Sequence, residues 1–122
     1  MARRRITQHA GEAAVQRWEE QHDAGLSPDR STLATAVRYL LEELADRAPG
    51  DSVEVRVPPF GVTQCVDGPQ HTRGTPPNVV EISPGTWLEL ATGARTWDEA
   101  QQAGGITASG TRADISAHLP LV

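Results

Sequence analysis

The spacing of apolar residues changes once along this chain, and that change constrains the fold more than any other feature. In residues 33–44, apolar side chains recur every three or four positions, which places them on one face of a helix. In residues 53–57, valines alternate with Glu54 and Arg56, the pattern of a strand with one buried face and one exposed face. A chain that changes period in this way is expected to pack helices against a sheet.

Helices are expected on the N-terminal side of this change. Residues 7–24 predict a first helix that stops at Gly25. The second helix starts at Ser27 or Ser31 and ends before the breaker at residues 48–50. Its exposed side is expected to carry two i,i+4 ion pairs, Arg38 with Glu42 and Glu43 with Arg47.

Strands follow the change. Residues 58–61, Pro-Pro-Phe-Gly, predict a turn, and residues 62–66 a returning strand that forms a hairpin with 53–57. A polar loop occupies residues 67–77, and a third strand is expected at residues 78–82.

The last third of the chain is punctuated by cap signals. Ser83-Pro84 starts a short helix that Gly93 closes, and Thr96 with Glu99 forms a capping box for a second one. A strand at residues 106–109 and a final helix at residues 111–119 complete the order. We therefore expect an α+β fold, with an antiparallel sheet of four to five strands and helices packed on one face.

Composition narrows the possible partners. The chain has 122 residues, its eleven basic residues are all Arg, and its formal net charge is -5, so nucleic acid is not an expected partner. A single cysteine, Cys65, fits a reducing compartment, and no apolar run is long enough for a membrane span. A cytoplasmic location is expected.

Two segments carry a resemblance to a known family. Residues 79–93 read VVEISPGTWLELATG, and residues 104–110 read GGITASG. This pattern resembles the bacterial sterol carrier proteins, in an actinobacterial-type subgroup. It is also similar to the C-terminal domain of mycothiol-dependent maleylpyruvate isomerase-like proteins. The resemblance covers residues 27–122, which leaves residues 1–26 as an N-terminal helical extension.

The resemblance implies a non-catalytic domain with an apolar tunnel between sheet and helices for a lipid, sterol or acyl chain. The candidate lining side chains are apolar and come from strands, turns and helices: Phe60, Val62, Val79, Ile82, Trp87, Leu88, Ile106, Ile115 and Leu119. The alternative is that these residues fill the core at ordinary density and leave no cavity.

A polar loop offers a second candidate. Arg73, with Thr72 and Thr75, has the chemistry to bind a carboxylate or phosphate head group through charge-assisted hydrogen bonds. The alternative is a structural ion pair of Arg73 with Glu81 or Asp114.

Catalytic and metal chemistry are poorly supported. Cys65 and His71 could form a nucleophile–base pair, but Cys65 lies within an expected strand, where buried thiols are inert. The His and Cys spacings match no metal-binding motif, and Gly104-Gly105 follows a helix rather than a strand, the wrong order for a dinucleotide site. We expect no cofactor, no metal and no enzyme activity.

Two other functions stay open. The chain could be an interaction or homodimerisation module with a filled core, provided that Val15 and Trp18 form an exposed apolar patch. It could instead be an accessory domain linked to mycothiol-dependent enzymes.

Overall fold

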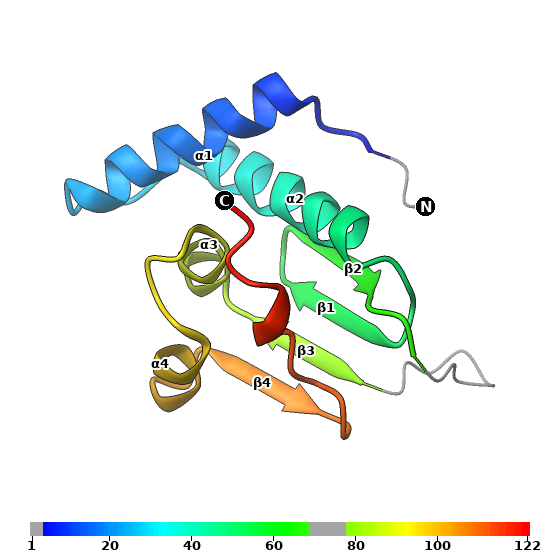
Figure 1. Cartoon of the computed structure of the whole chain (residues 1–122). Coiled ribbons are helices and arrows are strands. Elements are labelled where there is room, and N and C mark those ends of the chain that lie inside the picture. Colours follow the sequence, from blue (N-terminus) through cyan, green and yellow to red (C-terminus); the bar gives the residue numbers. More distant parts are fainter. Residues whose placement is uncertain (1–3, 69–77) are drawn as a thin grey trace.

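Four strands form one mixed sheet with the spatial order β2-β1-β3-β4 (Figure 1). The computed structural model describes residues 4–68 and 78–122. Its elements, in chain order, are α1 (Gln8–Asp23), α2 (Arg30–Arg47), β1 (Val53–Val57), β2 (Gly61–Cys65), β3 (Val79–Ile82), α3 (Pro84–Thr92), α4 (Trp97–Gln102), β4 (Ile106–Ser109) and the 3₁₀ turn η1 (Ser116–His118).

The centre of the sheet is parallel. β1 pairs with β2, and β3 with β4, in antiparallel register, but β1 and β3 run in the same direction. The expectation of an antiparallel sheet is therefore wrong for the central pair. A tight turn forces the β1–β2 hairpin to be antiparallel, whereas the long connection from β2 to β3 lets the chain return to the start of β1. There the Glu54 amide donates to the Asn78 carbonyl at 2.9 Å.

The two faces of the sheet differ sharply. The inner face is apolar and buried, through Val55, Val57, Val80 and Ile82. Helix α2 packs on this face, and α1 lies on α2 (Figure 1). No helix covers the outer face within the described residues, where polar side chains alternate with the buried ones. The predicted α+β arrangement, with helices on one face, is confirmed.

Helix α2 begins midway between its two expected starts, with an N-cap two residues after Ser27 and two residues before Ser31. Its N-cap is Asp29, whose carboxylate accepts from the Thr32 amide at 3.1 Å and from the Thr32 hydroxyl at 2.9 Å. Asp is a strong N-cap residue, and it takes precedence here over Ser27 and Ser31.

One of the two predicted ion pairs on α2 forms. Glu43 and Arg47 lie 2.9 Å apart, but Arg38 donates from Nε to the Phe60 carbonyl at 2.7 Å instead of pairing with Glu42. Glu42 accepts from the Arg5 and Ile6 amides. Partners distant in sequence have displaced the local pair.

The cap signals of the short helices are confirmed. Ser83 is the N-cap of α3 with Pro84 in its first turn, and Gly93 ends the helix in the left-handed conformation, with φ of 82°. The Thr96–Glu99 capping box opens α4, with both reciprocal hydrogen bonds present.

The predicted final helix is wrong. Only the short turn η1 forms, because the Asp114 carboxylate accepts from the Ser116 amide at 2.8 Å and closes a local turn. Beyond it the Leu121 amide donates to the Ala91 carbonyl at 2.8 Å, which ties the extended C-terminal segment to α3. Ile115 and Leu121 still reach the core.

All three tryptophans are buried. Trp87 is fully buried and donates from Nε1 to the Val37 carbonyl at 3.3 Å. Val15 and Trp18 of α1 also lie in the core, so the exposed patch that would favour association is absent from these positions. No helix in the described ranges has both the length and the apolar character that crossing a membrane requires.

Candidate functional site

The predicted lining residues separate into two groups. Five of them are buried in one core cluster: Phe60, Ile82, Trp87, Leu88 and Ile115. Ile106 and Leu119 are partly buried and pack against this cluster. Val62 and Val79 lie on the other face of the sheet, because they pair with Arg56 and Glu54, which point outward. The structure therefore does not gather all nine residues around one interior volume.

The second predicted site falls in a stretch without structural description. Arg73, Thr72, Thr75 and His71 lie outside the described residues, so the head-group role of Arg73 stays a prediction.

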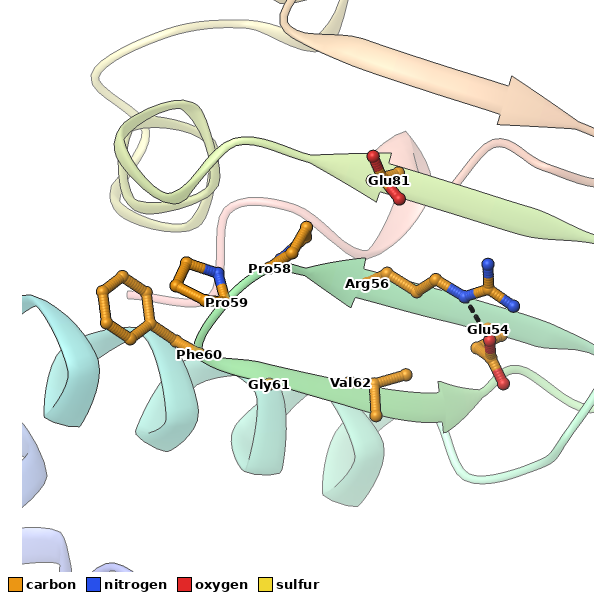
Figure 2. Close-up of a pocket in the computed structure, with 8 residues that line it drawn as sticks. All are labelled: Glu54, Arg56, Pro58, Pro59, Phe60, Gly61, Val62 and Glu81. Atoms are coloured by element: carbon orange, nitrogen blue, oxygen red, sulfur yellow. Dashed lines mark hydrogen bonds and ion pairs between the residues drawn. The ribbon is translucent and has the colours of Figure 1, made fainter.

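A groove of about 460 Å³ lies on the outer face of the sheet, at the tip of the β1–β2 hairpin (Figure 2). Figure 2 views this face with α2 behind the sheet. The lining side chains come from β1, the hairpin turn, β2 and β3: Glu54, Arg56, Pro58, Pro59, Phe60, Gly61, Val62 and Glu81.

Strand register brings these residues together. Arg56 stands opposite Val62 on the antiparallel side of β1 and opposite Glu81 on the parallel side. Successive side chains of a strand point to opposite faces, so Glu54 joins Arg56 on the outer face. The result is a row across three strands with an apolar end on β2 and an acidic end on β3.

The apolar end of the groove is held in place by α2. The Phe60 amide closes the hairpin turn on the Val57 carbonyl at 2.9 Å. From the helix side, the Arg30 guanidinium lies 5.2 Å from the centre of the Phe60 ring, and Arg38 binds the Phe60 carbonyl. Pro58 and Pro59 add two rings with no backbone donor. This wall is therefore apolar and anchored.

The polar end of the groove carries two carboxylates and one guanidinium. Arg56 donates from Nε to Glu54. Glu81 is exposed and forms no ion pair with any residue that the structure describes. The groove thus places an apolar wall beside a surface with excess negative charge, an arrangement suited to an amphipathic molecule.

Two other surface hollows have a larger polar surface than the groove. One, of about 400 Å³, lies between α3, α4 and η1, where Arg95 is 3.3 Å from Glu89. The other, of about 510 Å³, lies beside α1, where Arg4 pairs with Glu43 at 2.9 Å. Their apolar surface is similar to that of the groove, so they differ from it in the additional polar and charged groups that a ligand would have to desolvate.

The structure gives Cys65 no nucleophilic character. Its side chain is fully buried, and burial raises the pKa of the thiol to about 11. A thiol at that pKa is almost entirely protonated at neutral pH, and the thiolate is the nucleophile. Within residues 4–68 and 78–122, no three His, Cys, Asp or Glu side chains gather in a way that would hold a metal ion.

Sequence reasoning missed the groove because it looked for apolar residues between the sheet and the helices. A signal was present. Val62 falls on the outward-facing register of its strand directly after a Pro-Pro-Phe-Gly turn, so an apolar side chain on a polar face was foreseeable.

Fold and groove together define a small two-layer α+β domain with one helix-covered and one open sheet face. Residues 29–121 match a protein family described as bacterial SCP ortholog. The chain belongs to this bacterial sterol-carrier-like family. The match begins at the N-cap of α2, so α1 stands outside it. A comparison with curated proteins found no match.

Proposed function

We propose that this chain is a non-catalytic binding protein for an apolar or amphipathic small molecule, and that the molecule binds in the groove on the outer face of the sheet. One observation carries the proposal: a concave surface of about 460 Å³ with an apolar wall next to charged side chains. Binding sites for small molecules commonly have volumes of about 300–1,000 Å³ and few polar groups. Membership of a sterol-carrier-like family supports the same class of ligand.

The groove is favoured over the core as the binding place. Ile82, Trp87, Leu88 and Ile115 have no exposed surface, so a ligand among them would have to displace well-packed side chains. The groove is open without any such movement. The buried thiol of Cys65 suits a reducing environment, and we place the protein in the cytoplasm.

The alternative of a dimerisation module has lost its main argument, because Val15 and Trp18 pack inside the monomer. A role as accessory domain for mycothiol-dependent enzymes has no specific observation in its favour.

A neutral fluorescent probe tests the proposal. N-phenyl-1-naphthylamine brightens in apolar sites and carries no charge that would bias the result. We expect saturable binding, and we expect Val62→Asp to weaken it at least severalfold, because Val62 is 59% exposed in the groove. Gln64→Asp is the matched control: it places the same carboxylate on the same face of β2, outside the groove.

Three results separate the possibilities. Absence of saturable binding overturns the proposed function. If Val62→Asp leaves the binding unchanged, the ligand binds in the core and not in the groove. Equal weakening by both variants shows a general charge effect rather than a contact in the groove.

A further inference from the structure

We infer that the groove selects amphiphiles with a positively charged head group, such as an amine or a quaternary ammonium, over amphiphiles with a carboxylate. The inference rests on the proposed function and adds the chemical class of the ligand. It follows from the charges along the row that crosses β2, β1 and β3.

The guanidinium of the groove is already paired. Glu54 and Arg56 are two residues apart on β1 and point to the same face, and Arg56 Nε donates to a Glu54 carboxylate oxygen. An anionic head group at the Nη donors of Arg56 would lie close to this carboxylate and be repelled by it. The Glu54 carboxylate is half-buried and held in place by the strand.

The remaining carboxylate is open to solvent. Glu81 stands opposite Arg56 in the parallel pair, is exposed, and has no ion-pair partner among the residues described. An ammonium group placed beside Glu81 would gain an attraction without breaking an ion pair among the described residues. A carboxylate in the same place would be repelled.

Two further cations near the hairpin turn, among the residues that the structure describes, do not line the groove. Arg30 lies over the Phe60 ring from the helix side, and Arg38 is committed to the Phe60 carbonyl. Both side chains belong to α2, behind the sheet in the view of Figure 2, and neither contributes to the groove lining. The net charge of -5 on the whole chain acts in the same direction as the local charges.

The apolar wall determines where the alkyl tail of a bound amphiphile would lie. With the head group at Glu81, an alkyl chain would lie across Arg56 towards Val62 and the rings of Pro58 and Pro59. This orientation matches the apolar and acidic ends of the groove to the two ends of a cationic amphiphile.

Competition between two amphiphiles of equal chain length tests the inference. Decyltrimethylammonium and undecanoate, which both carry a ten-carbon alkyl tail, are titrated against bound N-phenyl-1-naphthylamine at neutral pH and low salt, each below its micelle-forming concentration. We expect the cation to displace the probe at a concentration about twofold to fivefold lower, the range that one exposed charge interaction supports. The preference should shrink as salt is added.

Matched variants assign the preference to its residue. Glu81→Gln should abolish this preference, which is measured as the ratio of the two displacement concentrations, so that any change in the affinity of the variant for the neutral probe cancels. Glu19→Gln, on the exposed side of α1, removes the same unit of net charge at a distance and should leave the preference intact. Arg56→Gln should increase the preference for the cation.

The outcomes distinguish this inference from the function on which it rests. Equal or stronger displacement by undecanoate overturns the cationic preference while the groove remains a binding site. A loss of preference in Glu19→Gln equal to that in Glu81→Gln assigns the effect to overall charge and overturns the role of Glu81. Failure of the neutral probe to bind overturns the proposed function itself.

Discussion

The ring of Tyr39 on α2 lies directly against Gly11 of α1, where a β-carbon on Gly11 would overlap the ring atoms. Both residues are buried. The two helices can approach this closely because Gly11 has no side chain. The Arg4 guanidinium lies on the Tyr39 ring, 5.2 Å from its centre, so the N-terminal segment depends on the same contact.

Gly11→Ala should therefore destabilise the protein despite the better helix propensity of alanine. A β-carbon on Gly11 would overlap the Tyr39 ring deeply, so we expect an overpacking cost in the upper part of the usual range, about 2–3 kcal/mol. The gain in helix propensity returns about 1 kcal/mol, which leaves a net loss of about 1–2 kcal/mol. Urea unfolding measures it. Gly85→Ala in α3 is the control, because a β-carbon there meets no atom within 4 Å. Equal stability of wild type and Gly11→Ala would contradict the tight contact.

Asn78 joins three parts of the fold, and its removal should be costly. Its Nδ2 donates to the Ser52 carbonyl at 2.8 Å and its Oδ1 accepts from the Arg112 amide at 2.8 Å, with the side chain buried. Asn78→Ala would leave both backbone groups without these partners, and we expect a loss of about 1–3 kcal/mol in the free energy of unfolding. Gln64→Ala, at an exposed position, should change it by less than about 0.5 kcal/mol. Similar losses in both variants would refute a special role for Asn78.

Asp29 should make stability depend on acid pH. Its hydrogen bonds from the Thr32 hydroxyl and amide lower the pKa of the carboxyl from 3.8 to about 2. A carboxyl whose pKa is lower in the folded state stabilises the fold above its unfolded pKa, and this stabilisation is lost as the pH falls from about 4 to about 2. Asp29→Asn keeps a capping oxygen but does not titrate.

Urea unfolding at pH 7 and at pH 2.5 measures this dependence. The difference between the two pH values should be smaller in Asp29→Asn than in wild type. An identical difference would show that Asp29 carries no part of the acid sensitivity.

Cys65 should be unreactive in the folded protein. With a pKa of about 11, roughly one thiol in a thousand is ionised to the thiolate at pH 8. The side chain also has no exposed surface. Ellman's reagent at pH 8 should label native protein only slowly and unfolded protein in urea at once. Cys65→Ala gives the background. Rapid complete labelling of the native protein would mean that the thiol is accessible.

The sequence predicted local structure well wherever the interacting residues lie within one helical turn of each other. The Thr96–Glu99 box, the left-handed Gly93 and the Glu43–Arg47 pair each involve residues at most four positions apart, so the sequence contains the whole interaction. Failures began where a distant partner competes. Arg38 reaches Phe60, 22 residues away, rather than Glu42.

The site was harder to foresee than the fold. The row of Val62, Arg56 and Glu81 depends on two strand registers, that of β1 with β2 and that of β1 with β3. No local motif determines the parallel pairing of β1 with β3. Apolar periodicity identified the buried residues, including Ile82 and Leu88, but a groove on a polar face leaves only a faint pattern. The head-group role of Arg73 remains a prediction.

The parallel pairing of β1 with β3 has a consequence for how the chain is made. The ribosome releases α1, α2, β1 and β2 before it has made β3. Until β3 is made, β1 has one unpaired edge, at the position that becomes the middle of the sheet. Such an edge is a template for pairing with another chain. The nascent N-terminal half is thus most prone to aggregation in the interval before β3 emerges. A synonymous slow codon between β2 and β3 would prolong this interval.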